Sequence, residues 1–219
     1  MPIAPMELLR SFLQSVGEEG TLLLPTFDIN VSTLVRFDIR NSPSKMGALT
    51  ECARSYPGAV RTRHPILSMA AIGKEASAFG ECDDYTGIGK GSPFERLLEL
   101  DGRIAILGLK ENDSMSFYHY VENVNGAAHR WTIGFETEFV DWDGSVSMKK
   151  HGFYARRRDE GIVTNVEPMA RLLWEKGLYA GEPHTEGAGL RTILAKDVYR
   201  ETEQIIREGK SEGNLYEQH

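Results

Sequence analysis

The sequence has little cysteine and no long apolar run, and both absences narrow the classes of protein to which it can belong. Its 219 residues include only two cysteines, Cys52 and Cys82, with no CxxC pair. This excludes a disulfide framework and a cysteine-rich zinc site, and it fits a reducing cytoplasm. No apolar stretch reaches the roughly 18 residues of a membrane span, and no secretory signal is visible at the start. We therefore expect a cytoplasmic protein without a membrane segment.

Positive charge is also scarce. The chain has 25 Lys and Arg against 32 Asp and Glu, a formal net charge of −7. General nucleic-acid binding needs a basic face, so we expect no nucleic-acid partner. No histidine pair has HxxxH or HExxH spacing, so no metal site is expected, and GxSxG, P-loop and GxGxxG motifs are missing as well. The acidic balance is mildly favourable for a cationic small molecule.

Helical and strand-like patterns alternate along the chain. Apolar residues recur at helical spacing from Met6 to Val16, and Thr21–Pro25 is typical of a short buried strand. The unbroken apolar run Arg103–Leu109 predicts a strand buried on both faces, and alternation over Trp131–Tyr154 predicts a hairpin. We expect one domain over the whole chain, an α/β fold with three layers (α/β/α) and a central mixed sheet. Residues 208–219 are charged and are expected to form a flexible tail.

The stretch SPSKMGALTE, Ser42–Glu51, carries more chemistry than an ordinary helix start needs. Its serines precede a predicted helix whose first N–H groups and partial positive charge suit a phosphate. Gly47 would let a ligand approach the backbone closely. The alternative is an ordinary capped helix with no ligand.

A second stretch, Arg61–Gly73, combines arginines with a histidine before a proline. Arg61 and Arg63 could pair with phosphates, and Ser68 follows His64 four positions later. The alternative is a strand end with solvated arginines and a core histidine.

The third stretch, DSMSFYHYVE, directly follows the predicted strand Arg103–Leu109. Ligands gather at the carboxyl ends of strands in α/β sheets. His119 and Glu122 would share one face of a helix, and a carboxylate beside an imidazole fixes its tautomer and raises its basicity, as a general base requires. The alternative is a surface histidine that lies beside a glutamate by chance.

These three stretches, in this order, resemble the aminoglycoside 3-N-acetyltransferase family, and the likeness runs from about Gly20 to Arg200. The longest match is PSKMGALTECARSYPGAVRTRHPILSMAAIG, with Thr62 at a position where the family usually has Ser. DSMSFYHYVE is similar to the family's Asp…Thr-x-x-His-x-x-Glu, with Ser116 at the Thr position. The family's usual opening strand and His-Ser-Ser-Leu turn have no counterpart before Met6, so we expect an N-terminally shortened domain.

The resemblance implies an acetyl-CoA-dependent enzyme of antibiotic resistance. It would acetylate the 3-amino group of the 2-deoxystreptamine ring of an aminoglycoside, a polycationic small molecule. His119 would be the general base, oriented by either Asp113 or Glu122. The amine would attack the thioester directly in a ternary complex, without an acyl-enzyme.

The resemblance also implies where the two substrates bind. The residues expected to bind coenzyme A come from the first two stretches: Ser42, Ser44, Met46, Gly47, Arg61, His64 and Ser68. Acidic residues around the mouth of the site would hold the acceptor: Glu81, Asp83, Asp84 and Glu138. Two alternatives remain open, an N-acetyltransferase of a non-antibiotic amine and a catalytically impaired relative. The sequence does not indicate the oligomeric state.

Overall fold

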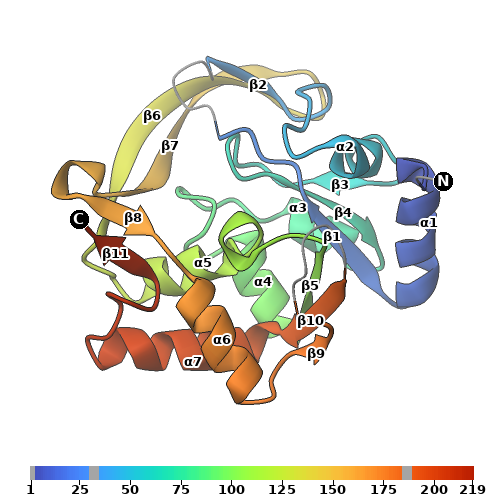
Figure 1. The fold of residues 1–219 in the computed structure, drawn as a ribbon. Helices are drawn as coiled ribbons and strands as arrows, with labels where there is room; N and C mark the ends of the chain where they lie inside the picture. Colours follow the sequence, from blue (N-terminus) through green and yellow to red (C-terminus); the bar gives the residue numbers. More distant parts are fainter. Residues whose placement is uncertain (1–2, 30–34, 184–188) are drawn as a thin grey trace. The chain divides into compact units, whose positions relative to one another are not determined.

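The chain is divided into two compact units. A computed structural model describes residues 3–29, 35–183 and 189–219 (Figure 1). Unit 1 comprises Met1–Gly87, Gly91–Pro93 and Gly134–Phe153, and unit 2 comprises Ile88–Lys90, Phe94–Ile133 and Tyr154–His219. The single domain expected from the sequence stays a prediction, and the two units are described separately below.

Unit 1 is built on a small antiparallel sheet. Its described helices are α1 (Pro5–Val16), α2 (Ala48–Arg54) and α3 (Ala76–Gly80). Its strands before the long hairpin are β1 (Thr21–Pro25), β2 (Arg36–Asp38), β3 (Val60–Arg61) and β4 (Met69–Gly73). The order β1-β4-β3 makes one sheet, in which β1 pairs antiparallel with β4.

The core of unit 1 follows from the alternation of side chains along β4. Ala70 and Ile72 pack with Leu9 of α1 and Ala53 of α2. The intervening Ala71 turns to the opposite face, where it packs with Ala76 and Phe79 of α3. Because neighbouring residues of a strand point to opposite faces, this sheet carries helices on both sides.

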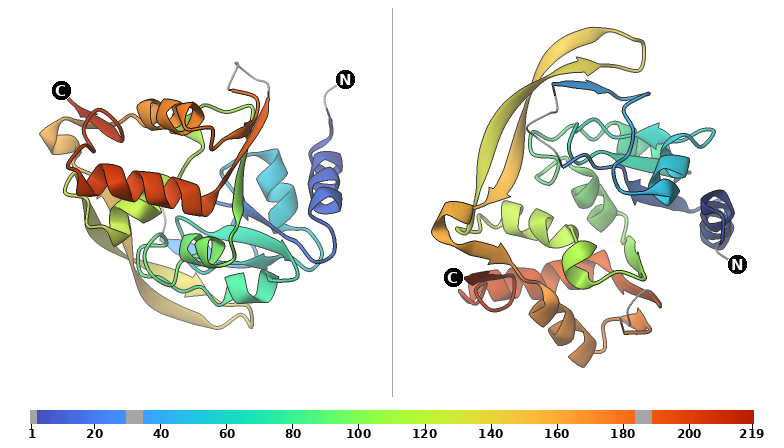
Figure 2. Two further views of the ribbon diagram at one scale, coloured as in Figure 1. Left: turned by 90° about the horizontal axis from the view of Figure 1, so that it is seen from below. Right: turned by 45° about the horizontal axis from the view of Figure 1, so that its top comes forward.

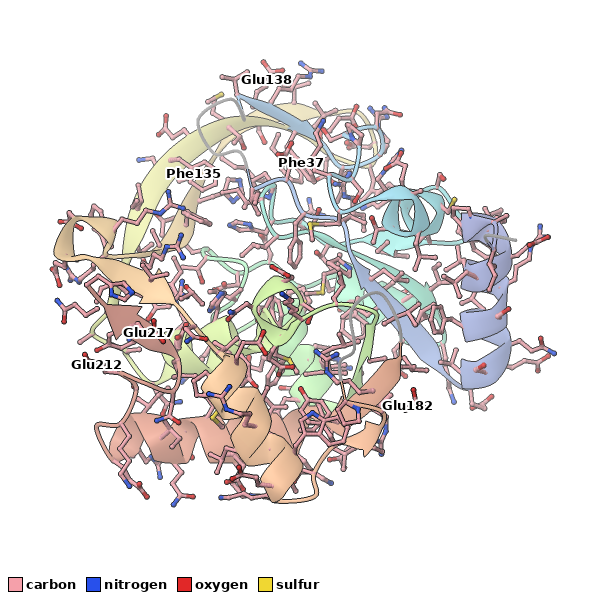
Figure 3. The ribbon with its side chains drawn as sticks, viewed as in Figure 1. Phe37, Phe135, Glu138, Glu182, Glu212 and Glu217 are labelled. Carbon is pink, nitrogen blue, oxygen red and sulfur yellow. The ribbon has the colours of Figure 1, made fainter. Side chains whose placement is uncertain are left out.

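A long hairpin runs through both units. It consists of β6 (Arg130–Val140) and β7 (Val146–Arg156), and Figure 2 shows these two strands side by side. Residues Gly134–Phe153 of the hairpin belong to unit 1. There β2 pairs parallel with β6, and Phe37 of β2 lies 5.7 Å from Phe139 between ring centroids. Figure 3 labels Phe37 on this strand and Phe135 on β6.

Unit 2 holds most of the helical residues. Its α-helices are α4 (Pro93–Glu99), α5 (Phe117–Val124), α6 (Glu167–Glu175) and α7 (Ala195–Arg207), with the 3-10 turns η2 (Glu111–Asp113) and η3 (Arg158–Glu160). Its strands are β5 (Arg103–Leu107), β8 (Ile162–Thr164), β9 (Ala180–Gly181), β10 (Leu190–Leu194) and β11 (Tyr216–Gln218). None of the helices in the described ranges is both long and apolar enough to cross a membrane.

Helix α7 packs against α5, α6 and β10. Its buried face includes Val198 and Ile205, and α5 buries Tyr118 and Val121. This packing fixes α5, the helix that carries the predicted base, within the core of unit 2. Pro168 near the start of α6 and Glu167 in its first turn are typical helix-start residues.

The mixed α/β class is confirmed, but one central sheet is not what the strands form. Within the described residues they make four sheets of two or three strands. The expectation that Arg103–Leu109 is buried on both faces is wrong, because among the described strands β5 pairs only with β10 and lies at the edge of its sheet. Ile106 is buried, whereas the residues on either side of it, Ala105 and Leu107, are exposed. The apolar run therefore buries side chains on only one face of β5.

The C-terminal residues also differ from the expected flexible tail. Strand β11 pairs antiparallel with β8, with Tyr216 opposite Thr164 and Gln218 opposite Ile162. Leu215, just before the strand, is fully buried. Residues 208–219 are mostly charged, so their composition did not indicate that Leu215 and Tyr216 anchor the segment.

Gly87 provides a test of the packing in unit 1. Its φ is +74°, and a Cβ added there would lie 2.6 Å from Cγ of His64. We expect Gly87→Ala to lower the free energy of unfolding by about 2–4 kcal/mol, from the left-handed backbone and the overpacking together. The control is Gly58→Ala, because Gly58 has φ +80° and open space around its Cβ position. Urea unfolding measures both variants, and equal losses would contradict the clash with His64.

Candidate active site

Helix α5 presents one polar face from an otherwise buried segment. Phe117, Tyr118, Tyr120 and Val121 are buried, and they anchor the helix. His119 keeps 30% of its side chain exposed, whereas the side chain of Glu122 is fully buried. The two residues are three positions apart, so one turn of helix brings them together.

Glu122 is the centre of a buried cluster. One of its oxygens, Oε2, accepts a hydrogen bond from Nδ1 of His119 at 2.8 Å. The other oxygen, Oε1, accepts one from Nε2 of His129 at 2.8 Å. Nε of Arg130 lies 2.6 Å from Oε2 as an ion-pair partner. The carboxylate is therefore held by two imidazoles and a guanidinium.

These contacts set the protonation states. Burial by itself would raise the pKa of Glu122, but Arg130 and the two histidines outweigh it and hold this pKa well below its ordinary range. Burial and the neighbouring Arg130 lower the pKa of His119. At neutral pH the carboxylate is ionised and the His119 ring is neutral. Its proton lies on Nδ1 toward Glu122, and the lone pair lies on Nε2.

Glu122, rather than Asp113, is the carboxylate that orients His119. Asp113 ends the short turn η2 and is exposed. It is not a hydrogen-bond partner of His119 in the described part of the chain. The two candidates were equivalent in sequence, but η2 directs Asp113 to solvent while the helical turn directs Glu122 to the ring.

A second buried carboxylate supports the same helix. Glu111 accepts hydrogen bonds from the hydroxyls of Tyr118 at 2.8 Å and Tyr179 at 2.6 Å. Arg191 pairs with its other oxygen at 3.1 Å. Because Tyr118 directly precedes His119 on α5, this network fixes the turn of helix from which His119 projects. Sequence reasoning missed Glu111, since its partners lie far along the chain.

The C-terminal strand contributes to the cluster as well. The ring of Tyr216 stacks on that of His129, with centroids 4.2 Å apart and an interplanar angle of 29°. Neighbouring Glu217, labelled in Figure 3, accepts a hydrogen bond from Asn165 and helps to hold β11 in place. His129, Arg130 and Tyr216 were not predicted from the sequence, because none has a motif spacing to Glu122.

The first stretch expected to bind coenzyme A forms a compact turn in unit 1. Ser44 donates its N–H to Glu51 at 2.8 Å, and its hydroxyl lies 2.7 Å from that of Thr50. A hydrogen bond from Arg54 lowers the pKa of Glu51 to about 2. Met46 is 42% exposed, and Gly47 precedes α2 with φ +114°. The helix is short, and Glu51 already takes one of the N–H groups in this turn.

Arg61 links the two stretches. Its guanidinium donates to the carbonyls of Ser42 and Thr26 and to the hydroxyl of Ser68, and it lies over the ring of Phe37. Burial lowers its pKa to about 10, still far above neutrality. Ser42 and Arg61 line a cavity of about 160 Å³ with Asp28, Arg36, Phe37, Pro43 and Lys45. Three of the seven expected residues, Ser42, Arg61 and Ser68, are thus joined directly.

His64 is enclosed and neutral. Its Nε2 bonds to the carbonyl of Gly152 at 3.1 Å, and its Nδ1 accepts the N–H of Leu67 at 3.1 Å. The ring meets His151 edge to face at 5.4 Å. Burial lowers the pKa of His64 to about 3 and that of His151 to about 4. Both imidazoles are therefore uncharged above pH 5.

The expected acidic residues are distributed over unit 1. Asp83 lies 3.9 Å from both Arg63 and Lys149, and Glu138 pairs with Arg36. Cys52 and Cys82 are free thiols. Among the residues that the structure describes, no group of three His, Cys, Asp or Glu side chains could hold a metal ion.

Removing the charge at the centre of the cluster should destabilise unit 2. We expect Glu122→Gln to cost about 3–5 kcal/mol at pH 7, because Arg130 is left buried without its counter-charge. The lowered pKa means that this stabilisation is complete above the ordinary carboxyl pKa and is lost only in strong acid. The deficit of the variant should therefore persist from pH 7 to pH 5 in urea unfolding.

Glu138→Gln is the matched control for this prediction. It removes a glutamate from an ion pair whose two side chains are 39% and 55% exposed, and such pairs contribute about 1 kcal/mol or less. Equal losses in the two variants would show that the buried cluster adds no special stability.

The neutral histidines predict a pH dependence. Unfolded histidine binds a proton near pH 6.5, whereas folded His151 resists until about pH 4. The unfolded state thus binds more protons between these values, and stability falls as pH falls. Nε2 of His151 is buried without a hydrogen-bond partner among the described residues. Between pH 6.5 and 4, the melting temperature of His151→Phe should therefore fall less than that of the parent. The melting temperature of the control His219→Phe should fall as much as that of the parent.

The chain is similar to known proteins in sequence and in structure. The model of the family described as aminoglycoside 3-N-acetyltransferase matches residues 1–206. Aminoglycoside N(3)-acetyltransferase VIII of Streptomyces fradiae is 37% identical over 155 residues, 69% of this chain and 46% of that protein. The type III enzyme of Acinetobacter baumannii is 33% identical over 109 residues, 49% of this chain and 38% of its own. These matches span less than half of the curated relatives' length.

Solved structures agree on the fold. AAC-VIa bound to sisomicin has a TM-score of 0.77 at 22% identity, covering 95% of this chain and 87% of that one. AAC-IIIb in a binary complex with CoASH has a TM-score of 0.77 at 20% identity, covering 94% and 84%. The family model covers nearly the whole chain, and the chain therefore belongs to the aminoglycoside 3-N-acetyltransferase family.

Proposed function

We propose that this chain transfers the acetyl group of acetyl-CoA to an amine, with the 3-amino group of a 2-deoxystreptamine aminoglycoside as the first acceptor to test. The observation that carries the proposal is the His119–Glu122 pair, in which Nδ1 is fixed by the carboxylate and Nε2 is left as an acceptor. Family membership and relatives named aminoglycoside N(3)-acetyltransferases support the choice of acceptor.

The chemistry needs a base because an amine is protonated at neutral pH and cannot attack a carbonyl in that form. Nε2 of His119 takes the proton, and the nitrogen lone pair then attacks the thioester carbon. The C–S bond breaks as the tetrahedral centre collapses, and coenzyme A leaves as a thiolate that takes up a proton. Ionised Glu122 stabilises the imidazolium formed in the first step.

Coenzyme A is proposed to bind through Ser42, Ser44, Met46, Gly47, Arg61, His64 and Ser68. The cavity beside Ser42 and Arg61 is bordered by Lys45 and Arg36, whose charges suit phosphate groups. The buried side chains of His64 and Ser68 would act by shaping the backbone around this cavity. The structural neighbour AAC-IIIb, with CoASH bound, supports acetyl-CoA as the donor.

A non-antibiotic amine is the second candidate acceptor. It is favoured by the arginines beside His119, which suit a polycation poorly. The free state of Cys52 and Cys82 is compatible with the reducing cytoplasm in which we place the protein.

Release of thiol from acetyl-CoA, measured with a panel of deoxystreptamine aminoglycosides and small amines, tests the function. We expect His119→Ala to lower the rate by about 100-fold to 10,000-fold, the usual contribution of a general base. His219→Ala, at an exposed histidine, should keep the parental rate. Equal rates for His119→Ala and the parent would show that His119 is not the base. If no acceptor is acetylated, calorimetry distinguishes an impaired relative, which does not bind coenzyme A, from an enzyme that binds coenzyme A but has not met its acceptor.

A further inference from the structure

Two guanidinium groups of unit 2 converge on one hydroxyl beside the proposed base. Nη2 of Arg130 lies 3.4 Å from Nε2 of His119 and 3.4 Å from Oγ1 of Thr164. Nη1 of Arg156 donates to the same Oγ1 at 3.3 Å. Three contacts thus connect Arg156 to the nitrogen on which the reaction depends.

The charges of these two arginines are balanced differently. Arg130 has Glu122 as its counter-ion. Arg156, which is partly buried, has no carboxylate within ion-pair distance among the residues that the structure describes. Burial lowers the pKa of Arg156, and the positive charges of Arg158 and Arg130 lower it further. Nearby Glu160 pairs with Arg157 instead.

The hydroxyl of Thr164 has a free donor. A threonine hydroxyl has one O–H and two lone pairs, and the two arginines occupy its acceptor side. The O–H must point elsewhere. The remaining N–H groups of Arg156 have no protein acceptor in the described ranges. A planar fork of donors with an adjacent hydroxyl is the usual setting for a carboxylate or phosphate.

We propose that Arg156 and Thr164 form a subsite for an anionic group, carboxylate or phosphate, of the acceptor molecule, and that this contact holds the acceptor amine at Nε2 of His119. The inference rests on the proposed function, because it takes His119 as the base. Of the two acceptors proposed above it selects the second, a non-antibiotic amine, with an anionic group a few bonds from the reacting nitrogen. Ammonium groups of a simple polycation would be repelled at this position.

Coenzyme A also carries phosphates, but its geometry fits this subsite poorly. The thioester must lie beside His119 for the amine to reach it. The nearest phosphate is then separated from the sulfur by the whole length of the pantetheine arm. Arg156 lies only a few contacts from the base, so an anion of the acceptor is the better match.

Binding can be tested without catalysis, with inorganic phosphate as the probe and the ring protons of His119 followed by NMR. A bound anion stabilises the imidazolium, so phosphate should raise the pKa of His119 in the parent. Arg156→Gln should weaken phosphate binding at least tenfold, and Thr164→Val should weaken it more than Thr164→Ser. The control is Arg171→Gln, at an exposed arginine of α6 for which the structure shows no ion-pair partner among the described residues. Equal phosphate affinity in Arg156→Gln and Arg171→Gln would overturn the subsite.

The second arm measures kcat/KM with matched primary amines that differ only in a carboxylate or phosphate. Arg156→Gln should lower the value at least tenfold for the anionic member of each pair and leave the neutral member within twofold. The effect should remain when S-acetylpantetheine, which lacks phosphates, is the donor. Its disappearance with that donor would assign Arg156 to coenzyme A and overturn the proposal.

The two arms separate this inference from the proposed function. His119→Ala should bind phosphate like the parent while losing acetyl transfer. If the parent binds phosphate through Arg156 but acetylates no amine, the subsite stands and the proposed function fails. If amines are acetylated but Arg156→Gln treats anionic and neutral members alike, only the subsite fails.

Discussion

An ionised carboxylate enclosed in protein is the constraint on which the site depends. Glu122 is fully buried, so its charge persists only because His119, His129 and Arg130 surround it. Burial of a charge without such partners is strongly unfavourable. The requirement for donors brings together one helix, the segment after it and the start of a strand. Tyr216, stacked on His129, adds the C-terminal strand to the same assembly.

The same constraint directs the reactivity of His119. Because the carboxylate accepts the proton of Nδ1, the lone pair of the ring lies on Nε2, while burial and the guanidinium of Arg130 lower the pKa of His119. The imidazole of His119, the proposed base, is thus unprotonated at neutral pH, and Glu122 would supply the counter-charge if it took a proton. Tyr118, the residue before His119 on the same helix, donates its hydroxyl to buried Glu111. Glu122 is the counter-ion of Arg130, and the charge of Arg156 is the one that we propose holds an anionic group of the acceptor.

Much of the local structure could be predicted from the chain. The strands Thr21–Pro25 and Leu190–Leu194 and the pairing of His119 with Glu122 follow from patterns of a few residues. The burial of β5 could not be predicted, because an apolar run does not reveal whether a strand lies at an edge. The C-terminal strand was hidden too, since Leu215 and Tyr216 are isolated apolar residues in a charged segment. The choice between Asp113 and Glu122 needed the direction of η2.

The sequence by itself determined the elements and the kind of chemistry, because helical spacing alone places an imidazole beside a carboxylate. Tertiary structure decided which groups complete that pair and which charges remain unmatched. His129 and Arg130 reach Glu122, and Thr164 connects Arg130 to Arg156, from segments with no fixed spacing to the helix. Their positions follow from the packing of strands and helices, and the energies of buried charges depend on those distances rather than on order along the chain.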